Sequence, residues 1–156
     1  MSFTQLGPDF DGTAANENTG LDISLSSDGS VLAIGAPYNG DAYGGAGQTR
    51  IYAWNGSAWV QRGGDINGEE IADWSGYSVS LSSDGTLVAI GAYGNDVQGR
   101  NGGQTRIYAW NGSAWVQRGS SIDGEAYDDG SGEDVSLSSD GTVVAIGASH
   151  NDGNGN

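Results

Sequence analysis

The sequence predicts an all-β protein built from repeated antiparallel sheets. A sixteen-residue phrase, QTRIYAWNGSAWVQRG, begins at Gln48 and recurs unchanged at Gln104, 56 residues later. A second phrase, close to SLSSDGTVVAIGA, begins at Ser24, Ser80 and Ser136 with the same spacing. A fixed period of this size is typical of solenoids, propellers and repeat arrays. Glycine occurs 29 times, and no segment shows the 3.6-residue apolar period of a helix.

One repeat, residues 59–114, divides into four predicted strands. WVQRG opens it as a short strand, the link GDINGEEIADWSG follows as a loop, and YSVSLSS alternates apolar and small residues as a strand does. Asp84-Gly85 predicts a two-residue type I′ turn, which needs positive φ at both central residues. LVAIGA is then a β-branched apolar strand, and a Gly-rich loop leads to QTRIYAW. Asn111-Gly112 predicts a second tight turn into the next repeat.

The first turn determines which side chains share a face of the sheet. With residues 28–29 as the turn, Leu25 lies opposite Leu32 and Ile23 opposite Ile34, all on one bulky face. The opposite face carries smaller residues. We therefore expect the bulky face of one sheet to fill the shallow face of its neighbour.

The second turn predicts aromatic and β-branched cross-strand pairs. With residues 55–56 as the turn, Tyr52 lies opposite Trp59 and Ile51 opposite Val60, and such pairs stabilise a sheet. Both faces carry packing groups, so each sheet is expected to lie between two others. Four antiparallel strands buried on both faces indicate a β-propeller blade. The predicted fold is an all-β propeller segment with a 56-residue repeat, two full blades and a partial third.

We interpret residues 1–156 as a single repeat domain with units 3–58, 59–114 and 115–156, the last incomplete. Phe3 aligns with the first residue of the outermost strand in each later unit. The third unit ends before an equivalent of QTRIYAW, so we expect that this chain does not close a propeller by itself. A piece of a longer propeller is the favoured interpretation, and assembly of identical chains into a ring or filament is the alternative. Deliberate design is a third, and unpaired edges invite strand addition in every case.

Short motifs beside the two inner strands of each unit resemble the FG-GAP repeat. Before the first inner strand stand Thr19-Gly20, Ser75-Gly76 and Ser131-Gly132, and at the end of the second stand Gly35-Ala36-Pro37, Gly91-Ala92-Tyr93 and Gly147-Ala148-Ser149. Phe is absent from the FG position, and GAP is complete once. The repeat is similar to those of integrin-α-like β-propellers and of many secreted bacterial and algal proteins. The resemblance covers nearly the whole chain and implies that these segments form the inner strands of four-stranded blades.

Several blades of that family carry a calcium loop of the D-x-D-x-D-G kind between their first two strands. In this sequence the corresponding link is only SSDG, at residues 26–29, 82–85 and 138–141. A tight hairpin cannot surround a cation with the six to eight oxygens that calcium prefers. We therefore expect the family's calcium site to be absent here.

Carboxylates in the acidic links offer another place for a cation. Spacing by two puts side-chain oxygens on one side of an extended loop, as in the first half of an EF-type loop. The links are also explained as turns in which Asx side chains accept backbone N–H groups. Calcium is therefore an open prediction, and no other cofactor is predicted. The candidate ligands are Asp9, Asp11, Asp65, Asn67, Glu69, Asp123 and Glu125.

Trp74 is the single candidate for a ligand contact, because it lies in a loop and has no aromatic counterpart in the other units. Asn55 and Asn111 begin N-glycosylation sequons, which would matter in a secretory eukaryote, and a turn explains the same asparagines. His150 is the only histidine, and no Ser/His/Asp set repeats. Nothing singles out the two carboxylates that a glycoside hydrolase needs.

Charge and composition narrow the classes of partner. The net charge is −15, with five Arg and no Lys, which argues against nucleic acid as a partner. Without cysteine there are no disulfides or thiolate metal sites. No apolar run approaches the length of a membrane span, and the N-terminal residues lack the pattern of a signal peptide.

The sequence therefore predicts a non-enzymatic scaffold of extracellular or cell-surface location, with a structural or adhesive role. The segments that differ between units, 37–46, 93–102 and 149–156, would meet a protein or glycan partner, and self-association through unpaired edges is a further possibility. A carbohydrate-binding lectin that uses Trp74 and the acidic loops is the alternative function. A hydrolase is a lesser alternative.

Overall fold

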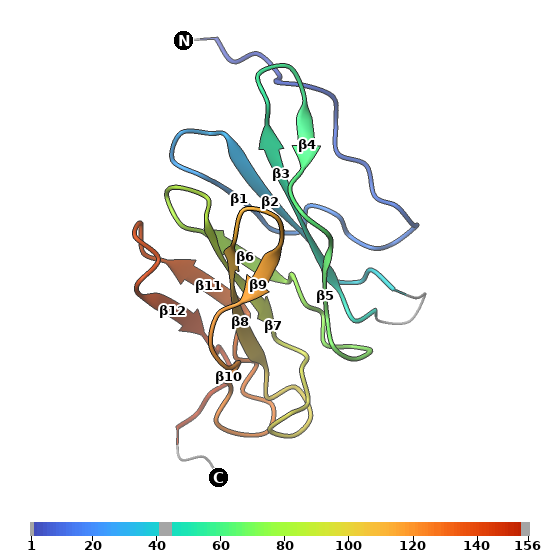
Figure 1. Cartoon of the computed structure of the whole chain (residues 1–156). Coiled ribbons are helices and arrows are strands. Elements are labelled where there is room, and N and C mark those ends of the chain that lie inside the picture. Colours follow the sequence, from blue (N-terminus) through green and yellow to red (C-terminus); the bar gives the residue numbers. More distant parts are fainter. Residues whose placement is uncertain (1, 41–44, 154–156) are drawn as a thin grey trace.

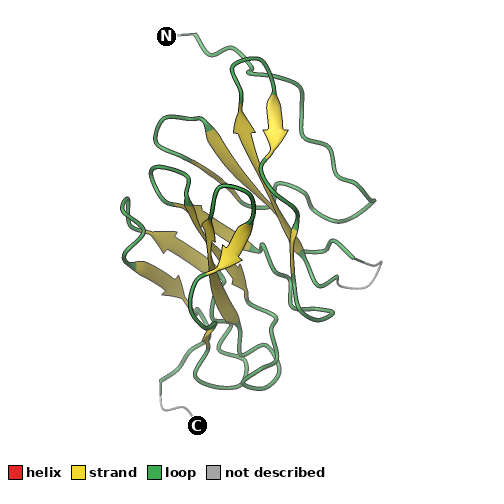
Figure 2. Ribbon diagram, viewed as in Figure 1, coloured by secondary structure: helices red, strands yellow, loops and turns green. Residues whose placement is uncertain are grey.

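The structure is a computed structural model that describes residues 2–40 and 45–153. Two antiparallel sheets and a hairpin follow one another along the chain (Figure 1). The described residues form strands and loops without a helix (Figure 2), which confirms the all-β prediction. Accordingly, they include no helix with the length and apolar character needed to cross a membrane.

The two sheets repeat the same plan, as the sequence period predicts. Each has four strands in a row and a fifth strand beside the third. The first sheet comprises β1 (Ile23–Leu25), β2 (Val31–Ala36), β3 (Gln48–Trp54), β4 (Trp59–Gln61) and β5 (Ile66–Asn67). The second comprises β6 (Ser78–Leu81), β7 (Leu87–Ala92), β8 (Gln104–Trp110), β9 (Trp115–Gln117) and β10 (Ile122–Asp123). The hairpin is β11 (Asp134–Leu137) with β12 (Val144–Gly147).

The acidic links, expected to be loops, contain the short strands β5 and β10. β5 pairs with the start of β3 through Gln48↔Asn67 and Thr49↔Ile66, and β10 pairs with β8 in the same way. Ile66 is 6% exposed and belongs to the core. Ile66 stands alone between Asp65 and Asn67, so this part of the link carries no periodicity from which a strand could be predicted.

The first turn of each unit has the predicted register but a different conformation. β1 pairs with β2 residue for residue as expected, yet only Gly29 has positive φ, at +72°. The turn hydrogen bond runs from the N–H of Gly29 to the carbonyl of Ser26, so Ser27 and Asp28 are its central residues. The Asp28 carboxylate accepts hydrogen bonds from the backbone N–H and hydroxyl of Ser30. This Asx interaction replaces the predicted type I′ turn.

The equivalent turn at Asp84 and Gly85 corrects the prediction in the same way. Gly85 alone has positive φ, its N–H donates to the carbonyl of Ser82, and Asp84 accepts from the N–H of Thr86. Hydrogen bonds from Ser82 and Thr86 lower the pKa of Asp84. The short acidic side chain, more than the left-handed preference of the dipeptide, determines this turn.

The second turn is displaced by one residue, which makes the predicted cross-strand pairs wrong. Trp54 lies opposite Trp59, with ring centroids 5.5 Å apart. Tyr52 is therefore not opposite Trp59, and Ile51 is not opposite Val60. The partner of each residue is shifted by two positions along the opposite strand. Each side chain nevertheless stays on its predicted face of the sheet, because side chains alternate with a period of two.

The Asn55 side chain explains this displacement. Its Oδ1 accepts the backbone N–H groups of Ser57 and Ala58 at 3.0 and 2.9 Å. Gly56 and Ser57 become the central pair, and only Gly56 has positive φ, at +98°. A left-handed glycine at the first central position is the requirement of a type II′ turn. Asn111 makes the same contacts in the second unit.

The core lies between the two sheets, as the alternation of bulky and small faces predicts. The second sheet is covered on one face by the first sheet and on the other by β11 and β12, since β6 packs against both β1 and β11. Burial of each large aliphatic side chain contributes about 1.5–3 kcal/mol. The buried cluster contains Val31, Ala33, Ile51 and Ile66 of the first sheet with Val79, Leu81, Val88 and Ile90 of the second.

Side chains of each unit satisfy backbone groups of the next. The N–H of Leu81 donates to the hydroxyl of Ser24 at 2.9 Å, and 56 residues later the N–H of Leu137 donates to Ser80 at 3.0 Å. These N–H groups lie on β6 and β11. They are on the edge of each strand that faces away from its hydrogen-bonded neighbour, β7 or β12. The same contact thus occurs at both junctions between units.

Glycines allow the backbones of neighbouring units to touch. A Cβ on Gly35 would lie 2.0 Å from the carbonyl oxygen of Gly76, and a Cβ on Gly91 would lie 2.0 Å from that of Gly132. Any side chain at these two positions would therefore push the units apart. Four of the six motif glycines, Gly35, Gly76, Gly91 and Gly132, therefore lie at contacts between units.

Candidate functional site

Glu17 is a buried carboxylate that organises the first acidic link. It is 2% exposed and accepts hydrogen bonds from the backbone N–H of Thr13 at 2.6 Å and from Asn39 at 2.7 Å. Arg50 on β3 lies 3.2 Å from it. Burial raises the pKa of Glu17, but hydrogen bonds from Thr19, Asn39 and Thr13 outweigh this and bring it to about 2. The ionised side chain therefore ties the link to the sheet.

Asp73 and Asp129 occupy the equivalent places in the next two units, and both are 4% exposed. Asp73 accepts the N–H groups of Glu69 and Glu70, and Asp129 accepts that of Glu125. Sequence reasoning missed these three acids. Their recurrence every 56 residues, just before the motif glycines, was the available signal.

The predicted calcium ligands of the second unit contact protein donors. The Gln48 amide donates to Asp65 at 3.1 Å and to Asn67 at 3.0 Å. Glu69 lies 3.4 Å from the guanidinium of Arg106. These three oxygens therefore serve hydrogen bonds and an ion pair of the sheet.

The remaining predicted ligands are spread over separate links. Gln104 donates to Asp123 at 3.1 Å, and Gln5 donates to Asp9 at 2.8 Å. Glu125 and Asp11 are exposed. Within residues 2–40 and 45–153, no three Asp, Glu or His side chains are grouped as a metal site requires. Calcium binding stays a prediction.

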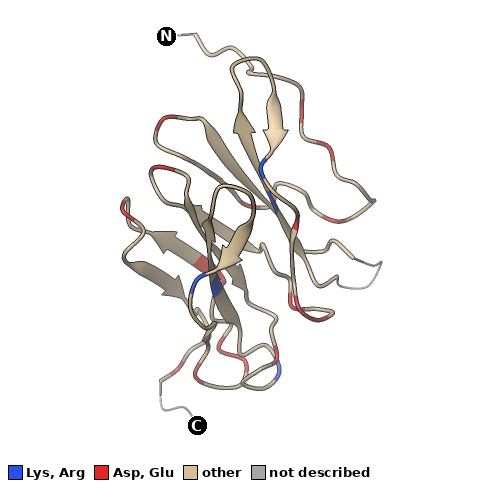
Figure 3. Cartoon of the chain, in the orientation of Figure 1, with Lys and Arg blue, Asp and Glu red and all other residues tan. Residues whose placement is uncertain are grey.

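An acidic hollow lies between the second link and the loop that follows β7. It measures about 600 Å³ and is bordered by Glu69, Glu70, Asp73, Asn95 and Asp96. Asp and Glu lie mainly in loops and at hairpin turns (Figure 3). Because the hollow joins two segments about 25 residues apart in the sequence, local patterns could not predict it.

Trp74 lies in a loop as predicted, within a group of aromatic side chains. Its ring centroid is 4.8 Å from that of Tyr93 and 6.1 Å from that of Tyr38. Its φ is +54°, a left-handed conformation that Asn18 and Gly130 adopt in the other units. Asn and Gly accept this conformation readily, whereas a bulky residue is strained by about 1–3 kcal/mol. The indole N–H is buried and has no hydrogen-bond partner.

The two sequon asparagines lie at exposed turns. Asn55 Oδ1 accepts the hydroxyl of Ser57 at 3.0 Å, and Asn111 Oδ1 accepts that of Ser113 at the same distance. These hydrogen bonds therefore support the interpretation of both asparagines as turn residues. Their glycosylation stays conditional on the source.

The segments that differ between units leave the sheets at one end. Residues 37–46 join β2 to β3, and residues 93–102 join β7 to β8. The predicted segment 149–156 follows β12. Residues 41–44 and 154–156 of these segments lie outside the described residues.

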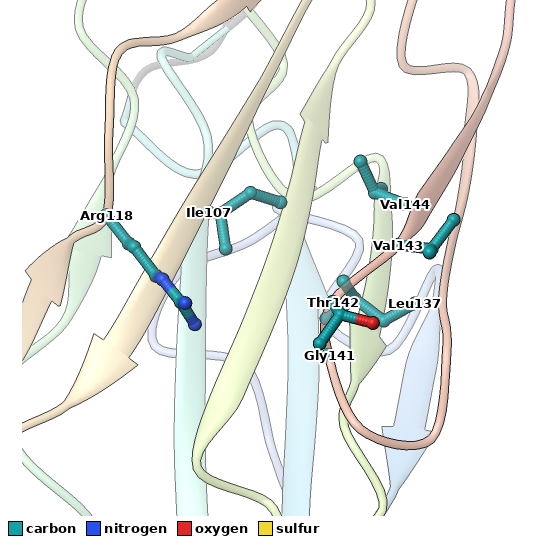
Figure 4. Close-up of a pocket in the computed structure, with 7 residues that line it drawn as sticks. All are labelled: Ile107, Arg118, Leu137, Gly141, Thr142, Val143 and Val144. Carbon is teal, nitrogen blue, oxygen red and sulfur yellow. The ribbon is translucent and has the colours of Figure 1, made fainter.

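A second hollow, of about 270 Å³, lies between β8 and the terminal hairpin (Figure 4). Ile107 contributes from β8, and Leu137, Val143 and Val144 contribute from the hairpin and its turn. Arg118, just after β9, points its guanidinium into the same space. The site is apolar with one cation, unlike the acidic hollow.

Comparison of the chain with protein-family models and with curated proteins gives no match.

Proposed function

We propose that the chain is a segment of a β-propeller-like scaffold of FG-GAP type, with two full blades and part of a third. Its function is structural or adhesive, at an extracellular or cell-surface location, where it presents loops to a protein or glycan partner. The observation that carries this proposal is the identical coupling of successive units, from Leu81 to Ser24 and from Leu137 to Ser80. Constant coupling gives a rigid stack with loops at fixed spacing.

The motif glycines support the FG-GAP part of the proposal. Gly35 and Gly91 belong to GAP-like segments, and Gly76 and Gly132 belong to FG-like segments. Gly35 lies against Gly76 at the first junction between units, and Gly91 lies against Gly132 at the second. The motif thus has a physical role in stacking that is independent of any single ligand.

The variable loops carry recognition in this proposal. They leave the same end of each sheet in a chain whose net charge is −15, so a complementary partner surface is basic or uncharged. The test replaces residues 96–100 with a Gly-Ser segment of equal length and measures binding to arrays of neutral glycans and basic extracellular proteins. The control is Asn111→Ala, at the opposite end of β8. We expect the loop variant to lose binding and the control to keep it; equal binding by both would contradict the proposal.

A lectin is the second candidate, because Trp74 combines a strained backbone with an unpartnered indole N–H. Such strain is found at ligand-binding sites more often than elsewhere. Trp74→Asn places the residue of the first unit in the same left-handed position, so the fold is retained. Loss of glycan binding in this variant, with binding kept in Trp74→Phe, would support the lectin. Unchanged binding in Trp74→Asn would exclude it.

A further inference from the structure

The terminal hairpin exposes a strand edge that is paired in the other two units. β2 pairs with β3 along its whole length, and β7 pairs with β8 in the same register. Within residues 2–40 and 45–153, β12 pairs with β11 alone. An open edge of this kind offers backbone N–H and C=O groups to another strand.

The hollow beside β12 corresponds to a filled space in the preceding junction. Leu87 and Val88 are 8% and 0% exposed there, and Tyr108 and Trp115 pack against the cluster that contains Val88. Their counterparts Val143 and Val144 line the hollow, and Val143 is 63% exposed. The difference arises because no aromatic strand covers the hairpin.

Among the described residues, Arg118 makes none of the side-chain contacts that its counterpart Arg62 makes. The Arg62 guanidinium lies 4.9 Å from the ring centroid of Trp110 and 5.7 Å from that of Trp115. It also donates to the carbonyl of Gly85 at 3.0 Å. A cation over two indole rings is a favourable arrangement. Arg118 points into the hollow where the corresponding rings would lie.

We propose that the β12 edge and the adjoining hollow form an acceptor site for an antiparallel strand of this repeat type, with the pattern Gln-Thr-Arg-Ile-Tyr-Ala-Trp. The strand extends the hairpin in the register of β7 with β8. Its tyrosine covers the apolar floor, and its tryptophan, with that of the returning strand, stacks on Arg118. This is recognition by strand addition, in which backbone bonds give affinity and side-chain pockets give specificity.

Continuity with the existing junction identifies the occupant. β3 and β8 have the same seven residues, and each pairs with the inner strand of its own unit. The inference rests on the stacked units of the proposed function. It adds to them the kind of strand that is bound and the place on the fold where it binds.

The probe is a synthetic peptide of residues 103–119, labelled at its N-terminus and titrated with the full chain while its fluorescence anisotropy is followed. We expect saturable one-to-one binding, and slower amide exchange at residues 144–147 in the complex. A peptide with Ser in place of Trp110 and Trp115 should bind at least about tenfold more weakly.

A variant of the chain locates the site independently. Val143→Asp places a charge in the hollow and should weaken peptide binding at least about tenfold. Val60→Asp is the matched control, since Val60 is 49% exposed and lies on β4 of the first sheet. It should bind the peptide as the parent chain does.

Three outcomes would overturn the proposal. They are no binding at about 1 mM peptide, equal binding by the Val143→Asp and Val60→Asp variants, and a stable dimer in light scattering that the peptide does not alter. In the last case a second folded copy would cover the hairpin. Amide exchange of Leu81, measured without peptide, distinguishes failure of the acceptor site from failure of the proposed function. If one of these three outcomes occurs and Leu81 still exchanges slowly, the acceptor site is wrong and the stacked scaffold stands.

Discussion

Alanine at Gly85 tests the contact between the sheets more sharply than any core deletion. Gly85 has φ of +64°, and a Cβ there would lie 2.7 Å from the Val31 side chain of the first sheet. Gly29 is its counterpart, with φ of +72°, and a Cβ there meets only Leu25 at 3.9 Å. The two alanines share the same backbone strain, and only one collides with a neighbouring unit.

The expected magnitudes follow from these distances. A left-handed alanine costs about 1–2 kcal/mol, which is the whole effect expected for Gly29→Ala. Overpacking a buried site adds about 1–3 kcal/mol, so Gly85→Ala should lower the free energy of unfolding by about 2–5 kcal/mol. Val31 is 4% exposed, so any movement of its side chain also displaces the residues that bury it.

Urea unfolding of both variants measures this difference, provided that the slope with denaturant is unchanged. Combining Gly85→Ala with Val31→Ala removes the collision and should show a favourable coupling of about 0.5–3 kcal/mol. If Gly85→Ala were no more destabilising than Gly29→Ala, the packing of the sheets would be refuted.

Three further effects are expected. Glu17→Gln leaves the buried Arg50 guanidinium without its counter-ion and should cost about 3 kcal/mol in urea unfolding; a loss under about 1 kcal/mol, the value of a surface pair, would contradict the contact. Trp115→Phe removes the 2.7 Å indole bond to a backbone carbonyl of the preceding unit and should cost about 1 kcal/mol, while an unchanged midpoint would argue against that bond. In the folded state the pKa values of Glu17, Asp28 and Asp140 are lowered to about 2 from ordinary values of 4.5 and 3.8, so their stabilisation is complete above about pH 5 and is lost as pH falls towards 2; a melting temperature that stays constant from pH 5 to pH 2 would contradict these shifts.

Regular strands could be predicted because their signals are local. The apolar run at residues 87–92 and the identically repeated run at 104–110 are strands with the predicted bounds. The faces of the sheets also followed from size alternation. Turn geometry could not be predicted as well, because Asn55 and Asp28 accept backbone N–H groups and so move the turn away from the dipeptide that tolerates positive φ.

The candidate sites depend on contacts that no local pattern reveals. Trp74 was found from its isolation in a loop, but its neighbour Tyr93 comes from the loop after β7. The hollow at Arg118 is formed by two different units. Glu17 and Asp73 share a role through different side chains, so a search for identical letters passes over them.

Amide hydrogen exchange at Leu81 tests the locking of successive units most directly. Its N–H is held by the Ser24 hydroxyl of the preceding unit, whereas Leu25, the equivalent residue of the first sheet, is 56% exposed. The stacked scaffold predicts slow exchange at Leu81, fast exchange at Leu25, and acceleration at Leu81 alone in Ser24→Ala. Equal exchange at the two leucines, unaltered by Ser24→Ala, would contradict the stacking of the units.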